Sequence, residues 1–313
     1  MPTRSQLLAL NDELRRLKAG GQRAVSVTED GLAQLREAVT ATEEPKGAEI
    51  ARVGLPAAAV SIPVARPMER PVAPVIEAMP ATPEITLPEG DKQTRWNFLR
   101  DLVLNDPVCR ARVYPGKRIV FGVGSLEANI MFVGEAPGGE EEEQGEPFVG
   151  RAGQLLNRMI KAMGLERSQV YIGNILNWRP EMPRNSDGSQ TGNRPPTVAE
   201  MAYCLPFIRA QIAIIQPQVL VALGKTAVDG LLGADRFKSM GAARGTWHAY
   251  ADTPLRASYH PSYLLRQEGL TSPAAKKIKR DAWEDLLAVM ERAKIPITGK
   301  QRNYFLSAGQ PPP

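Results

Sequence analysis

The chain has 313 residues, a formal net charge of +5 and a sequence pI near 9.2, which suits a polyanionic partner but is too mild to require one. Its two cysteines, Cys109 and Cys204, exclude a disulfide framework and a four-thiolate metal site within one chain. With no signal-like N-terminus and no apolar run of membrane length, we expect a soluble, cytoplasmic protein that does not enter a membrane.

Residues 1–40 carry leucines at helical spacing, over 5–18 and again over 30–39, which predicts two short amphipathic helices. Each is too short to be stable alone, so these helices are a candidate contact for a protein partner. Residues 41–92 are rich in Ala, Val and Pro, a composition that interrupts helices and interior strands. We therefore predict an extended, semi-rigid linker there.

Residues 93–293 have the pattern of an α/β domain, in which short apolar runs alternate with helical periodicity. We predict four buried strands, at 129–133, 170–176, 219–223 and 255–259. We predict helices at 96–104, 152–163, 197–215, 226–232 and 273–293, with Thr197 and Glu200 forming a capping box. The tail, residues 294–313, ends in three prolines and is expected to be disordered.

The first predicted strand ends in a glycine-rich turn, Gly134–Gly138, with one embedded acid, Glu135. Backbone amides in this turn could face a base or a sugar-phosphate, although a tight turn with an exposed Glu135 would give the same pattern. Phe148 then follows a rigid proline just before a helix that opens near Arg151. The N-terminus of that helix could receive a phosphate, whereas Phe148 could equally cap the core.

Asn174 ends the second predicted strand, and its amide offers both a donor and an acceptor. That combination suits the edge of a pyrimidine, although an asparagine at this place is more often a turn residue. The following loop contains Arg179 and Arg194 among Asn, Ser and Gly. This loop is either a solvated insertion or a contact to phosphates.

His260 is one of two histidines in the chain; it follows the last predicted strand and precedes a proline. A lone loop histidine is usually structural, but at the carboxyl edge of a parallel sheet it can reach a site. The segment behind it could act as an apolar wedge with a phosphate anchor, which would fill the gap left by an extruded base, or could be a helical turn packed on the core. The candidate DNA contacts in this segment are Ser262, Tyr263, Leu264, Leu265 and Arg266.

Six separated motifs occur in one order along the chain. They are GEAPGGEEEEQGEPFVGRAGQLL at 134–156, YIGNILNWRP at 171–180, NRPPT at 193–197, LGKTA at 223–227, ARGTWH at 243–248 and HPSYLLR at 260–266. Together they resemble the family 4 uracil-DNA glycosylases and their phage DNA polymerase-related relatives. The resemblance covers most of residues 96–293 and none of 1–90. It implies a three-layer α/β/α sandwich with a four-stranded parallel sheet, and a site for a flipped uracil at the carboxyl ends of the strands.

The resemblance also implies a role for each motif residue. Glu135 would orient or activate water, Phe148 would stack on uracil, Asn174 would hydrogen-bond its edge, and His260 would stabilise the departing base. The turn around the base would be Gly134, Ala136, Pro137 and Gly138. Because bond cleavage leaves positive charge on the sugar and negative charge on uracil, a carboxylate and a histidine donor both favour the transition state, and no metal is needed.

One feature of the family is missing. Its members typically hold an iron-sulfur cluster on four cysteines, whereas this chain has only Cys109 and Cys204, and Trp178 stands at the third position. We therefore predict that the chain binds no cluster and that Trp178 replaces it by apolar packing. The loop 181–192 is also longer than the usual family connection.

The leading hypothesis is a monomeric glycosylase that removes uracil from DNA. Two alternatives stay open. The first is a DNA-binding module without activity, attached to replication through its N-terminal arm, which the missing cluster and the unmatched first 90 residues would favour. The second is a glycosylase for another altered base, because Ala136 occupies a turn at which other superfamily branches vary.

Overall fold

The computed structural model describes residues 79–185 and 190–306. The two amphipathic helices predicted within residues 1–40 and most of the predicted linker lie outside the described residues. The described end of that linker, residues 79–91, contains no helix or strand. Its side chains Met79, Ile85 and Leu87 pack against the core, so the domain begins before residue 93.

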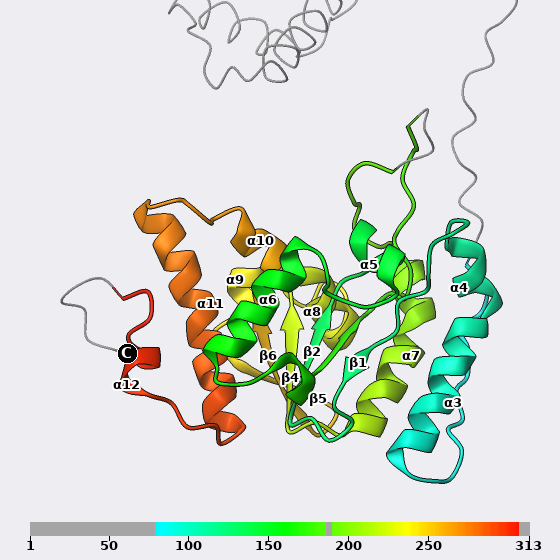
Figure 1. The fold of residues 1–313 in the computed structure, drawn as a ribbon, viewed down its shortest axis with the longest axis horizontal. Coiled ribbons are helices and arrows are strands. Elements are labelled where there is room, and N and C mark those ends of the chain that lie inside the picture. Colours follow the sequence, from blue (N-terminus) through cyan, green and yellow to red (C-terminus); the bar gives the residue numbers. More distant parts are fainter. Residues whose placement is uncertain (1–78, 186–189, 307–313) are drawn as a thin grey trace, which may run out of the picture. The chain divides into compact units, whose positions relative to one another are not determined.

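A six-stranded sheet forms the centre of the domain, with strand order β1-β3-β2-β4-β6-β5 (Figure 1). The four middle strands β3, β2, β4 and β6 are parallel, and each edge strand is antiparallel to its neighbour. The strands are β1 Val123–Gly124, β2 Ile130–Gly134, β3 Tyr171–Asn174, β4 Val219–Leu223, β5 Trp247–Tyr250 and β6 Thr253–Ser258. All residues of β2, β3 and β4 are buried, as expected of parallel strands covered on both faces.

Helices cover both faces of this sheet. Alternate side chains of β2 enter two separate apolar clusters, with Met131 and Val133 on one face and Ile130 and Phe132 on the other. Helices α3, α4, α7 and α8 contribute to the first cluster, and α6 and α11 to the second. The helices are α3 Lys92–Asn105, α4 Pro107–Arg112, α5 Gly139–Gln144, α6 Arg151–Ala162, α7 Val198–Ile215, α8 Lys225–Leu232, α9 Met240–Ala243, α10 Pro261–Leu265, α11 Pro273–Arg292 and α12 Gly299–Arg302, with a 3-10 turn at Arg167–Gln169. The three-layer α/β/α fold is thus confirmed.

The four predicted strands are the four parallel strands, and the five helices predicted between residues 96 and 293 are present. The predicted capping box at α7 is also present, because Thr197 Oγ1 accepts a hydrogen bond from Glu200 N at 3.2 Å and Glu200 Oε2 accepts one from Thr197 N at 2.8 Å. The sheet has two strands more than predicted. The edge strand β1 has two residues, and β5 alternates exposed with half-buried positions, so neither has the continuous apolar run that marks the inner strands.

The expected disorder of residues 294–313 is wrong for residues 294–306. This segment contains α12 and packs on α11, where Trp283 Nε1 donates to Gln301 O at 2.6 Å. Arg280 Nη1 donates to the carbonyls of Arg302 and Tyr304 at 2.8 Å each. The segment is held because Ile295, Ile297 and Tyr304 pack against the second apolar cluster. Residues 307–313 lie outside the described residues.

Within the described residues, one helix is long and apolar enough to cross a membrane, namely α7, with 18 residues and a mean hydropathy of 1.4. Ten of its 18 residues are buried in the domain, where the helix packs between α3 and the sheet. The burial of α7 is therefore that of a core helix in the described domain.

Candidate active site

The loops that follow the four parallel strands are joined at the carboxyl edge of the sheet. Ile175 N donates to Gly134 O at 3.0 Å, which ties the ends of β2 and β3 together. Gly224 N donates to Ser258 O at 2.9 Å and ties β4 to β6. Thr226 Oγ1, at the start of α8, then reaches across to the Glu135 carboxylate at 2.8 Å. The predicted site residues of all four loops thus belong to one edge.

Phe148 and Asn174 lie directly over the bare Cα of Gly134. A methyl group added at Gly134 would lie 2.5 Å from two atoms of the Phe148 ring and closer still to Asn174 Oδ1. Asn174 is 6% exposed, and its Oδ1 has no hydrogen-bond partner within the described ranges. Since buried polar atoms are normally paired, an unpaired amide oxygen beside an aromatic face indicates a place prepared for a polar ring.

The turn that carries Phe148 is held from two sides. Phe148 has a φ of 55°, a conformation that is uncommon for a residue with a side chain. Arg167 donates to Pro147 O at 2.6 Å and to Phe148 O at 3.2 Å. A methyl group at Gly153 would overlap the Phe148 carbonyl, so glycine is required for α6 to approach this turn. Sequence analysis did not single out Arg167 or the role of Gly153.

Glu141 joins the glycine-rich turn to the Phe148 turn. Its Oε2 accepts from Gly138 N at 3.0 Å, and its Oε1 accepts from Val149 N at 3.1 Å and Gly150 N at 2.9 Å. One carboxylate therefore satisfies three amides from two segments. The sequence carried a signal for this residue, because an acid three positions after the N-cap of α5 fits a capping box.

Glu135 is half-buried at the end of β2. Burial raises the pKa of its carboxyl group, and the hydrogen bond from Thr226 offsets part of that rise. Its backbone carbonyl accepts from Leu176 N at 3.1 Å, which fixes the position of the residue against β3. Glu135 is thus a carboxylate whose proton affinity is increased by its surroundings, as expected of a functional acid or base.

His260 is the N-cap of α10. Its Nδ1 accepts from Ser262 N at 3.2 Å and lies 2.7 Å from Ser262 Oγ. Burial, followed by the nearby Arg266 cation, lowers the pKa of His260 to about 4. A neutral ring with Nδ1 as acceptor carries its proton on Nε2, which leaves a donor for a ligand. The ring centroid lies 5.6 Å from that of Phe148.

The other residues predicted around the base form the start of the same loop. Pro137 is buried, and Ala136 is partly buried against the core. The predicted apolar wedge is only partly present. Leu264 is 6% exposed and packs in the core, so the structure supports the alternative of a helical turn for that residue. Leu265 is half-buried, Tyr263 stacks on Tyr259 with centroids 5.1 Å apart, and Ser262 holds His260.

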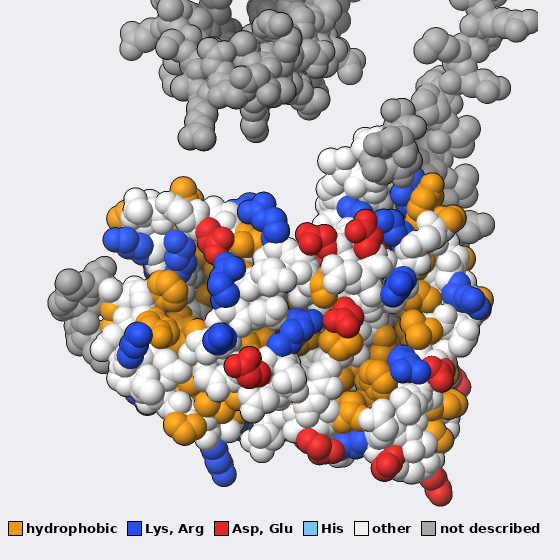
Figure 2. All heavy atoms as spheres, in the orientation of Figure 1, with side chains coloured by type: hydrophobic (Ala, Val, Ile, Leu, Met, Phe, Trp, Pro, Cys, Tyr) orange, Lys and Arg blue, Asp and Glu red, His pale blue; other side chains and the backbone are white. Residues whose placement is uncertain are grey.

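Two of the predicted phosphate contacts, Arg179 and Arg194, are used inside the protein. Arg179 forms an ion pair with Glu142 at 3.0 Å and donates to Asn193 Oδ1 and to two loop carbonyls. Arg194 forms a two-pronged pair with Glu200, at 2.7 and 2.8 Å. Both arginines therefore stabilise the loop 181–192. Arg151 and Arg266 are exposed. On the face of the domain that Figure 2 shows, Lys and Arg side chains are spread with acidic side chains between them.

Cys109, Cys204 and Trp178 lie in one buried cluster with Tyr203. Both cysteines are free and buried, and contact with Cys204 together with burial raises the pKa of the Cys109 thiol. The rings of Trp178 and Tyr203 lie 6.4 Å apart. A four-iron cluster needs four thiolates, and within the described ranges no group of three or more His, Cys, Asp or Glu side chains could hold a metal. The residues present therefore do not fit the cluster.

A parallel α/β domain that places a carboxylate, a neutral histidine, an aromatic ring and an unpaired amide at its carboxyl edge is an enzyme fold with a site for a planar polar ring. Residues 121–287 match the model of the uracil DNA glycosylase superfamily. The chain belongs to this superfamily, as its motifs indicated.

Individual relatives agree with this assignment. The chain is 38% identical over 179 residues to a type-4 uracil-DNA glycosylase of Thermotoga maritima, covering 56% of this chain and 81% of that protein. It is 34% identical over 186 residues to a type-4 uracil-DNA glycosylase of Pyrobaculum aerophilum, covering 58% and 89%. A DNA polymerase of Bacillus phage SP01 also matches, at 25% identity over 148 residues, covering 47% of this chain and 14% of that protein.

Proposed function

We propose that this protein removes uracil from DNA by hydrolysing the N-glycosidic bond, which leaves an abasic site. The observation that carries the proposal is the juxtaposition of the Phe148 ring and the unpaired Asn174 amide over Gly134. The similarity to type-4 uracil-DNA glycosylases supports the same reaction. Because Phe148 and Asn174 are buried, the uracil nucleotide has to leave the base stack to reach them.

The base is recognised by stacking and by its polar edge. Uracil presents an N3–H donor between two carbonyl acceptors, and the Asn174 amide can pair with one donor and one acceptor of that edge. Phe148 offers a rigid face, since its turn is fixed by Arg167 and by Glu141. Gly134 leaves the space that a side chain would otherwise fill.

His260 and Glu135 act on opposite ends of the breaking bond. The electron pair of the bond moves onto uracil, and His260, neutral because the pKa is about 4, donates its Nε2–H to the oxygen that gains negative charge. The Glu135 carboxylate stabilises the positive sugar and orients the water that adds to its anomeric carbon. A carboxylate with a raised pKa can also accept the proton released by that water.

The enzyme works without an iron-sulfur cluster in this proposal. Trp178 and Tyr203 stabilise the region by packing, and Cys109 and Cys204 stay as thiols. Iron and acid-labile sulfide in the purified protein, together with its visible absorbance, test this point. Iron in a stoichiometric amount, with the absorbance of a cluster, would contradict it.

DNA contacts, location and partners are part of the same proposal. We propose that Arg151, Tyr263, Leu265 and Arg266, which are exposed or half-buried, contact the strand on either side of the flipped nucleotide. We propose that the protein acts as a monomer in the cytoplasm, that it does not bind membranes, and that its N-terminal residues bind a protein partner. Two thiols that stay reduced are consistent with that compartment.

The decisive experiment measures free uracil released from an oligonucleotide with a single uracil, followed by alkaline cleavage at the abasic site. The test protein is compared with a Glu135→Ala, His260→Ala double variant. A matched control, Glu291→Ala with His248→Ala, removes the same residue types away from the site. Release by the wild type and the control but not by the test variant supports the proposal. DNA binding with no release of uracil would support the non-catalytic alternative.

A further inference from the structure

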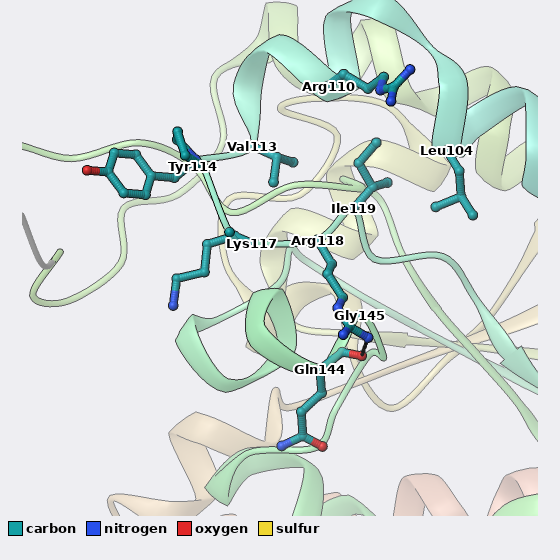
Figure 3. Close-up of a pocket in the computed structure, with 11 residues that line it drawn as sticks. Leu104, Arg110, Val113, Tyr114, Lys117, Arg118, Ile119, Gln144 and Gly145 are labelled. Carbon is teal, nitrogen blue, oxygen red and sulfur yellow. Dashed lines mark hydrogen bonds between the residues drawn. The ribbon is translucent and has the colours of Figure 1, made fainter.

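A second cavity lies beside the Phe148 turn, between α4 and α5, with a volume of about 560 Å³. Its floor is apolar and includes Leu104, Val113 and Ile119. Figure 3 shows Arg110 and Arg118 on opposite sides of this floor. Cavities of this size hold small organic ligands, and an apolar floor between two cations fits a base flanked by phosphates.

The charges at this cavity are available to an anion. Arg110 and Arg118 are both exposed, and no ion pair to either is found within the described ranges. Arg118 makes one long hydrogen bond, from Nη1 to Gln144 O at 3.5 Å. Lys117 is the third cation and is paired with an exposed acid, Glu143, at 2.7 Å. Since exposed pairs contribute little energy, that lysine can also turn to a phosphate.

An aromatic side chain stands at the rim. Tyr114 is 42% exposed, and the guanidinium of Arg184 lies 3.6 Å from its ring centroid. Exposed aromatic rings next to cations are the surfaces on which proteins stack bases of a single strand.

A hydrogen bond and a packing contact link this cavity to the segment that leads to Phe148. Arg118 N donates to Glu142 O at 2.7 Å, and the side chain of Arg118 packs on Gly145, the C-cap of α5. Gly145 is three residues from Phe148, a span of at most roughly 10 Å. One strand of DNA rises about 3.4 Å per nucleotide, so a strand whose uracil stacks on Phe148 reaches the cavity within about three nucleotides.

We propose that this cavity is a second nucleotide site, which binds a base and its phosphates two or three nucleotides from the flipped uracil on the same strand. The proposal rests on the proposed function for its substrate, but it assigns a contact that the uracil pocket does not provide. It also gives Arg110 and Arg118 the phosphate-binding role that Arg179 and Arg194 cannot perform while they brace the loop.

The test uses the full chain with an Arg110→Gln, Arg118→Gln double variant and two single-stranded substrates. One has six nucleotides on each side of uracil and the other has one. For the long substrate we expect kcat/KM to fall about tenfold with kcat unchanged, because two phosphate contacts are lost, and the logarithmic salt slope to fall by about 1.4. For the short substrate we expect no change. Arg158→Gln with Lys277→Gln removes the same charge from exposed positions on α6 and α11 and should change neither.

Binding of a uracil-free single strand, followed by fluorescence anisotropy, separates this proposal from the glycosylase activity. Weaker binding by the Arg110, Arg118 variant supports the second site even if no uracil is released. Equal binding by this variant and the control variant overturns it, whatever the activity. Equal losses on the long and short substrates also overturn it. Unchanged strand binding with loss of binding to a poly-glutamate peptide would overturn it in favour of an acidic protein partner.

Discussion

Adding one methyl group at Gly134 is the sharpest test of the pocket. In a Gly134→Ala variant the new Cβ would lie 2.5 Å from the Phe148 ring, whereas carbon atoms in contact are about 3.5–4.0 Å apart. The ring or the strand must therefore move by about 1 Å. The backbone of Phe148 resists this movement, because Arg167 holds its carbonyl and α6 is packed against it at Gly153. The ring is then displaced into the space where uracil stacks.

A displacement of this size in a reacting site costs about 100-fold in rate, so we expect kcat/KM for uracil release to fall by about 100-fold. Overpacking costs about 1–3 kcal/mol of unfolding free energy, which lowers Tm by about 2–12 °C for a domain of this size. Steady-state kinetics and thermal denaturation measure the two effects. Gly299→Ala is the control, because a methyl group there meets no atom within 4 Å. A folded Gly134→Ala protein with wild-type kcat/KM would refute the assigned pocket.

Three further predictions concern titration, the buried ion pairs and the tail. Because burial raises the pKa of Glu135, activity should fall as the pH drops through a value above 4.5. A His260→Asn variant should be slower but should keep the same decrease at acid pH, since the pKa of His260 is about 4. Loss of this acid limb in the His260 variant would contradict the assignment to Glu135. Asp285→Asn should lose about 3–5 kcal/mol in urea denaturation, because it leaves the buried Arg256 guanidinium without a counter-charge, whereas Asp101→Asn at an exposed pair should lose less than about 1 kcal/mol; equal losses would show that burial is not the cause. A chain ending at residue 293 should lose about 1–3 kcal/mol or more in thermal denaturation, because Trp283 loses the carbonyl to which its indole donates; unchanged stability would contradict the role of this tail contact.

The inner sheet could be predicted from sequence because its strands have one environment along their whole length. Every residue of β2 and β4 is buried, so a continuous apolar run marks each strand. The edge strand β5 has no such run, since its side chains alternate between half-buried and exposed. The prediction of disorder for the C-terminal tail was wrong for a different reason. Its three terminal prolines indicated disorder, but a few apolar contacts and hydrogen bonds from α11 are enough to hold residues 294–306.

Some of the site residues could be predicted from the sequence, and others could not. Glu135, Phe148, Asn174 and His260 stand at strand ends or rigid turns, where sequence motifs and fold class together predict convergence. The sequence position of an arginine does not show whether its guanidinium is available to a phosphate. An exposed loop of the same composition can leave the guanidinium in solvent or surround it with carbonyls. Arg179 donates to two backbone carbonyls, to the Asn193 side-chain amide and to the Glu142 carboxylate. Glu141 was overlooked because the sequence does not show which of four consecutive glutamates stands three positions after the N-cap of α5, the position that fits a capping box.

The position of His260 depends on charges buried away from the pocket. Asp285 is fully buried in α11 and binds Arg256 on β6 at 3.0 Å and Arg244 at 2.6 Å. The Arg244 guanidinium lies 4.2 Å from the ring centroid of Tyr259, the residue directly before His260. One carboxylate therefore fixes both the last strand and the loop that leaves it. Because a catalytic donor has to be held within a fraction of an ångström, the stability of α11 and the placement of His260 cannot be changed independently.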